Sequence, residues 1–332
     1  MMKFRWKVIA GILISAAFLT YALSQVDYAE MIKAFSEASY IWTIPMMLSV
    51  LATMAIRAER WKWLLKPIRL FQLNTLFSSI MIGFMANNLL PARIGEVVRA
   101  ISLSKKHQLS KSSVFATIVA ERIFDSLGLL TVFYITFFVV DYPDELKKAG
   151  LLVLLFTLTA LVFLYLLKFK TEMAVRLSCN IINVISHKLA DRVDSILRKF
   201  IYGLSIMTSP GSILVIFIYS VFLWIFTGVS GYLIFFAFDL HPSIWASFIL
   251  LFVTVLAVSL PSSPGYIGTF HAACIIAFNL IGSLGMFGQE VSKSVALSYS
   301  IILWSCQFVP VTIIGLYYLK KEHLKFKEIG QE

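Results

Sequence analysis

Long apolar stretches separated by short polar segments dominate this chain. Six of the stretches are about long enough to cross the ~30 Å hydrocarbon core of a membrane as helices. They occupy residues 8–24, 41–56, 113–140, 149–167, 213–237 and 294–319. The longest polar segment, residues 168–208, is too short for a separate catalytic domain. We expect it to form amphipathic helices at the cytoplasmic surface.

Two further apolar stretches are interrupted by proline and polar residues. Both contain the pattern Pro-x-x-Ile-Gly-x-x-x-x-Ala, which begins at Pro91 in one stretch and at Pro264 in the other. We predict that each interruption is the tip of a re-entrant helical hairpin, the first over residues 71–104 and the second over residues 243–283. Because proline suits the first turn of a helix, the second limb of each hairpin is expected to begin at the tip, with Ser263 as an N-cap.

The distribution of charge sets the topology. The mean hydropathy is +0.84 and only 14% of the residues are charged, against about 25% in soluble domains. Basic residues cluster beside the apolar stretches, and such clusters mark the cytoplasmic side. A topology with both termini in the cytoplasm leaves only five Lys and Arg residues elsewhere. Four of these lie outside and the last lies within the membrane: Lys33, Lys147, Lys148, Lys293 and Arg122.

In this topology three crossings separate the two hairpins, so the hairpins enter the membrane from opposite faces. We therefore expect an all-α polytopic protein with about six transmembrane helices and two re-entrant hairpins in an inverted repeat. One transmembrane domain would cover residues 1–332, with repeat 1 at about 1–140 and repeat 2 at about 149–319. Inverted repeats with broken helices are typical of alternating-access transporters, whose substrate site lies near the membrane midplane.

The first apolar stretch follows a short basic segment and also fits a signal peptide. An uncleaved helix is preferred because the rest of the chain is itself polytopic. The three cysteines are far apart in the sequence and predict neither a disulfide framework nor a zinc site. They are Cys179, Cys274 and Cys306. We expect no metal and no cofactor.

The hairpin tips are the candidate substrate site. Irregular backbone is tolerated at membrane depth only where it is packed in protein or lines a cavity. The second limbs would point their positive N-terminal ends at the membrane centre and favour phosphate, and the guanidinium of Arg93 would match the phosphate oxygens. The predicted substrate-binding residues are Asn87, Asn88, Arg93, Glu96, Arg99, Arg122, Ser262, Ser263, Tyr266 and Thr269. The predicted hinge or turn residues are Pro91, Gly95, Pro261, Pro264, Gly265 and Gly268.

Structural interpretations of some of these residues stay open. Arg93, Glu96 and Arg99 follow one another at spacings of three residues. They also fit a salt-bridged helix face that reaches to the lipid headgroups. Gly95 and Gly268 also fit close packing between helices.

A second polar group interrupts the stretch that follows the first hairpin. Glu121 and Asp125, four residues apart, share one helix face there, and Arg122 can reach Asp125 three residues further on. Ionisable residues in a spanning helix mark a pathway or a proton relay by default, and the alternative is an ion pair that fixes helix packing. Glu121, Asp125 and His271 are the proton-coupling candidates, although a lone histidine also fits a structural hydrogen bond. Arg57 is expected to be a snorkelling anchor at the end of the second helix.

Three motifs occur in order along the chain. They are Asn-x-Leu-x-Pro-x-Arg-x-Gly-Glu at 87–96, Glu-Arg-x-x-Asp at 121–125 and Pro-x-x-Pro-Gly-x-x-Gly at 261–268. With them, essentially the whole chain resembles the lysylphosphatidylglycerol synthase transmembrane-region family. This is a family of flippase-like membrane proteins that includes the translocating half of the multiple peptide resistance factor. The resemblance implies a lipid translocase fold with a polar core. The core residues would be Arg93, Glu96, Glu121, Arg122, Asp125 and the turn at 261–268.

Two functions of different classes fit these observations. The favoured one is the translocation of a phosphate-bearing lipid, a phospholipid or a polyprenyl phosphate, between the leaflets of the cell membrane. The alternative is an accessory subunit or an enzyme of lipid modification, in an aminoacyl-phosphatidylglycerol or lipid-linked-sugar pathway, with a glycosyltransferase or aminoacyltransferase as its partner. Full-length synthases append a soluble aminoacyl-transfer domain, and the sequence shows no Asp-x-Asp, no Gly-rich nucleotide loop and no metal-ligand cluster. We therefore expect no enzymatic activity. The net charge of +11 is explained by anionic lipid headgroups as partners rather than nucleic acid.

Overall fold

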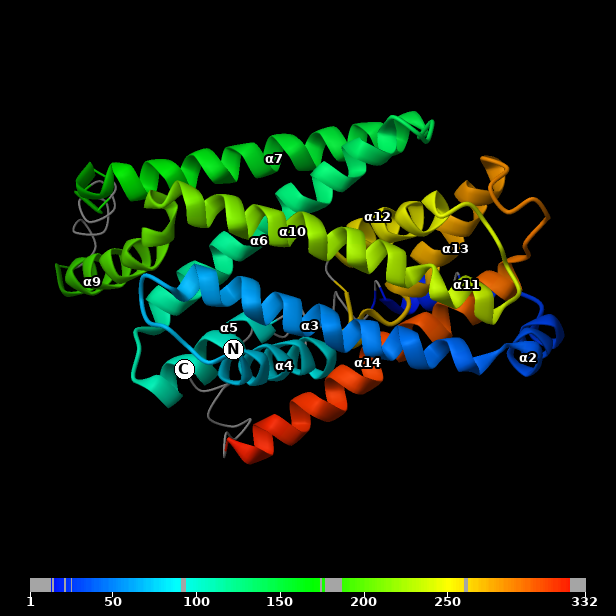
Figure 1. The fold of residues 1–332 in the computed structure, drawn as a ribbon, viewed down its shortest axis with the longest axis horizontal. Helices are drawn as coiled ribbons and strands as arrows, with labels where there is room; N and C mark the ends of the chain where they lie inside the picture. Colours follow the sequence, from blue (N-terminus) through cyan, green and yellow to red (C-terminus); the bar gives the residue numbers. More distant parts are fainter. Residues whose placement is uncertain are drawn as a thin grey trace. The chain divides into compact units, whose positions relative to one another are not determined.

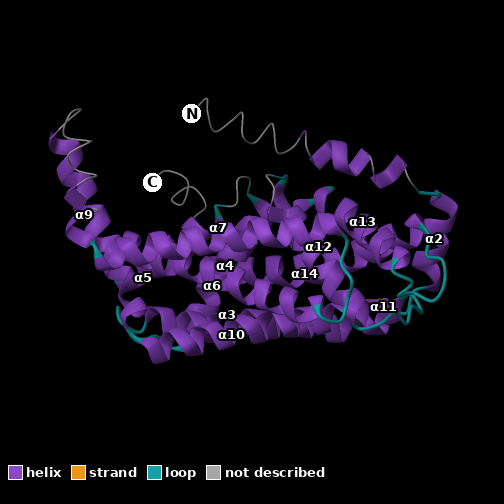
Figure 2. Ribbon diagram, turned by 90° about the horizontal axis from the view of Figure 1, so that it is seen from above, coloured by secondary structure: helices purple, strands orange, loops and turns teal. Residues whose placement is uncertain are grey.

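The structure is a computed structural model that describes residues 13, 15–20, 22–24, 26–90, 94–173, 175–176, 187–259 and 262–322. All regular secondary structure in these residues is helical (Figure 2). The helices, drawn in chain order from blue to red in Figure 1, are α2 (Tyr28–Glu37), η1 (Tyr40–Trp42), α3 (Thr43–Leu65), α4 (Leu73–Leu89), α5 (Gly95–His107), α6 (Lys111–Phe137), α7 (Asp144–Phe169), α9 (His187–Gly203), η3 (Leu204–Thr208), α10 (Pro210–Gly231), α11 (Leu233–Ala237), α12 (Trp245–Ser259), η4 (Pro264–Tyr266), α13 (Thr269–Ser283) and α14 (Lys293–Lys321).

Five helical segments of the described chain are long and apolar enough to cross a membrane. They are Tyr40–Leu65, Asp144–Phe169, Pro210–Ala237, Pro264–Ser283 and Lys293–Lys321. The predicted class, an all-α polytopic membrane protein, is confirmed. The predicted stretch at 113–140 forms α6, a 27-residue helix that is not uniformly apolar because charged residues lie in its middle. Most of the predicted stretch at 8–24 lies outside the described residues.

The described residues form two compact units. Unit 1 comprises those within 1–54, 81–95 and 225–323, and unit 2 those within 55–80, 96–224 and 324–332. Each unit therefore draws on both halves of the sequence. The predicted boundaries of the repeats stay a prediction.

Unit 1 contains the second broken helix pair. α12 packs along α13, and α13 packs along α14. At the centre of the unit the ring of Tyr299, which is fully buried, lies 4.8 Å from the ring of Phe235 and 4.9 Å from the ring of Phe278, measured between centroids. At one end α2 packs on α14, where the main-chain N–H of Asp27 donates to the hydroxyl of Ser294 at 3.0 Å.

Unit 2 is organised around α6, on which α7 and α9 pack. Small residues allow close approach to this helix. A Cβ at Gly128 would lie 2.7 Å from the main chain of Ser220 on α10, and a Cβ at Gly203 would lie 2.2 Å from the carbonyl oxygen of Ser113. The hydroxyl of Ser113 in turn donates to the carbonyl of Lys199 on α9 at 2.6 Å.

The first predicted hairpin corresponds to the helix pair α4 and α5. In unit 2 the rings of Phe71, just before α4, and His107, at the end of α5, lie 5.0 Å apart. In unit 1 the main-chain N–H of Gly95, the first residue of α5, donates to Oδ1 of Asn87 at 2.8 Å. Contacts at both ends of the pair show that the chain reverses direction between the helices. The re-entrant position of either pair in a membrane stays a prediction.

The second limbs begin later than predicted. α5 begins at Gly95, and Pro91 lies outside the described residues. Pro264 starts only the 3₁₀ turn η4, because Gly265 (φ 67°) and Tyr266 (φ 60°) adopt left-handed backbone conformations that a helix cannot continue. α13 begins at Thr269, after Gly268 (φ 86°). Ser263 precedes η4, but the predicted N-cap is wrong because its hydroxyl donates to the carbonyl of Ile267 at 3.1 Å and caps no N–H group.

Candidate functional site

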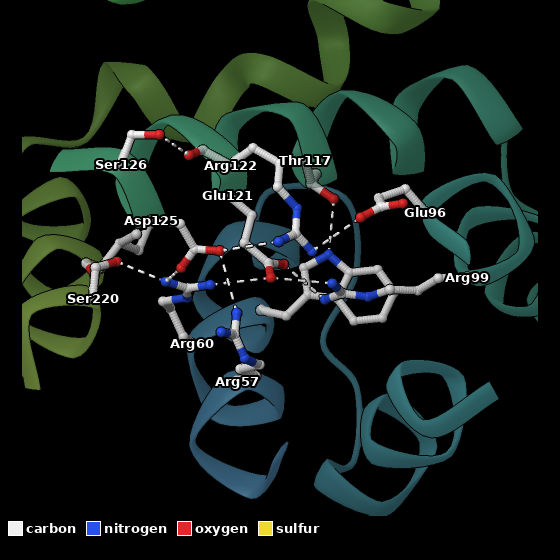
Figure 3. A network of polar contacts seen from close by, with 12 residues as sticks. Arg57, Arg60, Glu96, Arg99, Thr117, Glu121, Arg122, Asp125, Ser126 and Ser220 are labelled. Atoms are coloured by element: carbon white, nitrogen blue, oxygen red, sulfur yellow. Dashed lines mark hydrogen bonds and ion pairs between the residues drawn. The ribbon is translucent and has the colours of Figure 1, made fainter. Parts of the chain in front are cut away.

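Charged residues from α3, α5 and α6 meet inside unit 2 (Figure 3). We call this group the charge cluster. It consists of Arg57, Arg60, Glu96, Arg99, Glu121, Arg122 and Asp125. Every member makes at least one ion pair to another member, and most of the pairs join different helices.

Arg60 lies at the centre of the charge cluster. Its side chain is fully buried, and its Nη2 donates to Glu121 Oε1 at 3.0 Å. Its Nη1 pairs with the carboxylate of Asp125 and donates to Ser220 Oγ at 2.8 Å. Because Glu121 and Asp125 lie four residues apart on α6, both carboxylates face the same guanidinium. Arg60 thus joins α3 to two successive turns of α6.

Arg99 binds Glu121 from the opposite side. Its two terminal nitrogens reach the two carboxylate oxygens, at 3.1 Å and 2.7 Å. Its guanidinium also lies 3.7 Å from the centroid of the Trp61 ring, and the indole N–H of Trp61 donates to Thr117 Oγ1 at 3.0 Å. Only 2% of the Arg99 side chain is exposed. Arg99 is therefore a buried partner of α6, which excludes the headgroup-facing interpretation for this residue.

Arg57 and Arg122 bind Asp125 at the edge of the charge cluster. Arg57 Nη1 donates to Asp125 Oδ2 at 3.2 Å and Arg122 Nη1 to the same oxygen at 3.3 Å (Figure 3). Arg122 also pairs with Glu96 at 3.5 Å, and 40% of its side chain is exposed. Arg57 is 9% exposed, so the predicted snorkelling anchor is wrong. α3 continues to Leu65, eight residues beyond Arg57, and places this arginine inside the helix bundle rather than at its edge.

The buried part of the charge cluster is rich in arginine. Among the described residues it contains the three arginines Arg57, Arg60 and Arg99 and the two carboxylates of Glu121 and Asp125. The half-exposed pair of Arg122 and Glu96 compensates itself. The Nε atoms of Arg60 and Arg99 are buried and have no acceptor among the described residues. Buried cations are costly unless they are paired. The buried guanidinium groups thus present N–H donors of the kind that bind carboxylate and phosphate oxygens.

Of the predicted substrate-binding residues, Glu96, Arg99 and Arg122 belong to the charge cluster. The asparagines predicted at the first tip make hydrogen bonds within unit 1. Asn87 caps α5. Asn88 Nδ2 donates to Thr312 Oγ1 at 2.9 Å and to the carbonyl of Phe308 at 3.3 Å. The side chains of both asparagines thus make hydrogen bonds to α5 or α14 within unit 1.

The second tip is likewise held by internal contacts. The main-chain N–H of Ser263 donates to the hydroxyl of Ser15 at 2.7 Å. Thr269 Oγ1 donates to the carbonyl of Tyr266 at 3.0 Å. The hydroxyl of Ser262 is buried and has no hydrogen-bond partner among the described residues. Arg93, Pro91 and Pro261 lie outside those residues.

His271 is buried in α13, and its Nδ1 lies 3.0 Å from Ser300 Oγ. This contact fits the structural alternative for the histidine. Its proton-coupling role, like those of Glu121 and Asp125, stays a prediction.

The sequence interpretation missed Arg60 and the polar residues that support the cluster. The predicted topology places Arg60 on the cytoplasmic side with most of the other basic residues, whereas it lies inside α3. On α10, Trp224 donates its indole N–H to the main-chain carbonyl of Asp125 at 2.7 Å. The signal that could have revealed Arg60 is the spacing Arg57-x-x-Arg60, which places both arginines on one helix face.

The fold and the site define a class: an all-α polytopic membrane protein with a buried, arginine-rich charge cluster. Residues 8–315 match the family described as the lysylphosphatidylglycerol synthase TM region, and the chain belongs to this family. The resemblance carried by the three motifs is thus confirmed. The family description names a membrane region of a lipid synthase and supports a role connected with membrane lipids.

Two archaeal relatives extend the comparison. The UPF0104 membrane protein MJ1595 of Methanocaldococcus jannaschii is 23% identical over 316 residues, which cover 92% of this chain and 91% of the relative. A UPF0104 membrane protein of Methanothermobacter thermautotrophicus is 25% identical over 255 residues, 73% of each chain. No solved structure matches the chain significantly.

Proposed function

We propose that this protein moves a phosphate-bearing lipid, a phospholipid or a polyprenyl phosphate, between the two leaflets of the cell membrane. The observation that carries the proposal is the buried, arginine-rich charge cluster, in which the Nε donors of Arg60 and Arg99 have no acceptor among the described residues. A lipid phosphate supplies one or two negative charges and several acceptor oxygens. These oxygens match the planar fork of N–H donors of a guanidinium group.

The half-exposed pair of Arg122 and Glu96 is the part of the cluster that a headgroup meets first. When a phosphate oxygen takes the place of the Glu96 carboxylate, the guanidinium of Arg122 keeps its charge partner while the lipid is bound. The acyl or prenyl chains stay in the bilayer, because nothing in this exchange requires them to leave it. The protein thus needs to shield only the headgroup.

We further propose that both termini are cytoplasmic and that the protein transports lipid without changing it chemically. The positive-inside distribution of Lys and Arg supports this orientation. A glycosyltransferase or an aminoacyltransferase that supplies or consumes the lipid is the partner expected for such a transporter.

Lipid exchange in liposomes tests the proposal. The full chain is reconstituted, and the exchange of fluorescent phosphatidylglycerol, a polyprenyl phosphate and a phosphate-free glycolipid between leaflets is followed. We expect the protein to accelerate at least one phosphate-bearing lipid and not the glycolipid. Arg122→Met should slow the exchange by ~10-fold or more, because a hydrogen bond to a charged group contributes about 1.5–3 kcal/mol. Lys33→Met, at an exposed pair on α2, is the matched control.

The possible results of this experiment distinguish a wrong lipid site from a wrong function. If no phosphate-bearing lipid is exchanged, translocation is excluded and the accessory role in lipid modification takes its place. If exchange occurs and Arg122→Met matches the wild type, the function stands but the charge cluster is not the lipid site.

A further inference from the structure

One face of α14 contacts both interrupted helix pairs, at the end of α4 and at the turn between α12 and α13. We call these two places the first and the second break. Trp304, Phe308 and Thr312 follow one another at spacings of four residues and therefore share this face. All the contacts concerned lie within unit 1.

The first break is attached through Asn88, at the end of α4. Its side-chain N–H groups donate to Thr312 Oγ1 and to the carbonyl of Phe308, at 2.9 Å and 3.3 Å. The two helices also touch further along, since a Cβ at Gly315 would lie 2.3 Å from the Cβ of Met85 on α4. The end of α4 is thus fixed to α14 by both polar and close-packed contacts.

The second break is attached through Gly265. Its carbonyl accepts the indole N–H of Trp304 at 2.7 Å, and the Trp304 ring stacks on the Phe308 ring with 4.4 Å between centroids. A Cβ at Gly265 would lie 2.8 Å from the Phe308 ring and 3.4 Å from the carbonyl oxygen of Asn88. The two breaks therefore meet each other as well as α14.

α14 is weakened at this place by Pro310, which lies between Phe308 and Thr312. Proline has no N–H, so the carbonyl of Cys306 lacks the donor that the helix would otherwise provide. Helices bend most readily at such positions. The helix is therefore easiest to bend where both breaks are attached.

We propose that Asn88, Gly265, Trp304, Phe308 and Thr312 form a latch that holds the two breaks together, and that bending of α14 at Pro310 opens it. The role of the latch in transport rests on the proposed function. Opening of the latch separates the two breaks, and this is the step that lets a lipid headgroup pass. Asn88 and Trp304 are then positioning residues, because they act through the two breaks rather than on the lipid.

Distance measurements test the latch independently of transport. Spin labels are placed at the exposed positions Leu89 and Ile267 in full-length protein whose native cysteines are replaced by alanine, and the label distances are measured in liposomes. Asn88→Ala and the nearly isosteric Thr312→Val should each raise, about fivefold, the ratio of the molecules with a long label distance to the molecules with a short one. That change corresponds to ~1 kcal/mol, the usual net contribution of one hydrogen bond. Pro310→Ala should lower the ratio, and Asn279→Ala, at an exposed position of α13, should leave it unchanged.

Identical distance distributions in wild type, Asn88→Ala and Thr312→Val would overturn the latch. So would an equal effect of Asn279→Ala. If the distributions shift as expected while no lipid is exchanged, the latch stands and the proposed function fails. If lipid is exchanged but the distributions do not respond, the function stands and the latch fails.

Discussion

Arg60 shows how a single residue can hold several helices together. Its guanidinium binds Glu121, Asp125 and the hydroxyl of Ser220, so α3, α6 and α10 meet at one side chain. Removing one partner of a buried ion pair costs far more than the net contribution of the pair, because the remaining charges stay buried without compensation.

Arg60→Met is therefore expected to lower the free energy of unfolding by about 3–5 kcal/mol. The midpoint of thermal unfolding in detergent measures the effect. Lys33→Met removes an exposed pair on α2 and should change the midpoint little. Equal midpoints for Arg60→Met and wild type would show that the charge cluster does not stabilise the fold.

At this scale the sequence predicts the carboxylates better than their partners. Glu121 and Asp125 are recognisable because their spacing on one helix is local information. Arg60 and Arg99 pair with them across other helices, and no spacing in the sequence specifies such a pairing. Arg57 and Arg60 were misassigned because a cation at the end of an apolar stretch looks the same whether the helix stops there or continues.

Contacts between helices depend on where glycine allows the backbones to approach. Gly203, at the end of α9, lies against α6, where an added Cβ would come within 2.2 Å of the Ser113 carbonyl oxygen and 2.8 Å of the Ala116 Cβ. A backbone atom cannot move aside as a flexible side chain can. The approach of α9 to α6 therefore requires glycine at this position.

Gly203→Ala is expected to destabilise the protein by about 1–3 kcal/mol, the usual cost of overpacking. Gly211→Ala is the matched control, because an added Cβ there would meet nothing within 4 Å. Thermal unfolding in detergent compares the two variants. A Gly203→Ala protein as stable as Gly211→Ala would mean that α9 is not held against α6 as described.

The attachment of α9 to the end of α7 is expected to depend on pH. Leu167, Val175 and Ile201 form a buried apolar contact there. Beside it, Arg198 binds Glu172 at 2.8 Å and 3.1 Å. These hydrogen bonds from Arg198 hold the pKa of Glu172 below its ordinary value of 4.5. The ion pair thus stabilises the attachment above about pH 4.5 and is lost as the pH falls through the lower pKa of the folded state.

Hydrogen exchange of α9 at pH 6 and at about pH 3.5 measures this loss. We expect faster exchange at the lower pH in wild type, after correction for the intrinsic rates, and a smaller change in Glu172→Gln. Because the pair is exposed, the effect should be small. An equal change in both proteins would show that the ion pair does not control the attachment.

The positions of most helices follow from the apolar pattern, whereas their ends do not. The predicted stretches at 149–167, 213–237 and 294–319 correspond to helices in the structure. α3 continues beyond its predicted end because its last turns bury Arg60 and Trp61 as well as Leu64 and Leu65, so charged residues interrupt the apolar pattern where the helix continues. α13 begins after its predicted start because three residues in left-handed conformations precede it, and proline alone does not reveal them.

At the scale of the whole molecule, exposed apolar surface agrees with a membrane. α7 exposes Leu152, Phe156 and Phe163, at 68%, 75% and 60%. Contiguous apolar surface of this kind is rare in soluble monomers. The structure accounts for it if lipid covers this face, and the orientation across the membrane is then set by the basic residues.

That orientation can be tested at two loops that follow corresponding helices. Lys106, at the end of α5, and Gln289, after α13, are exposed, and in an inverted repeat they lie on opposite sides of the membrane. We expect Lys106→Cys to react with an impermeant maleimide only in permeabilised cells, and Gln289→Cys to react in intact cells. The reason is that three crossings, an odd number, separate the two hairpins. Reaction of both cysteines from the same side would exclude the inverted repeat and leave the two broken helix pairs as parallel copies.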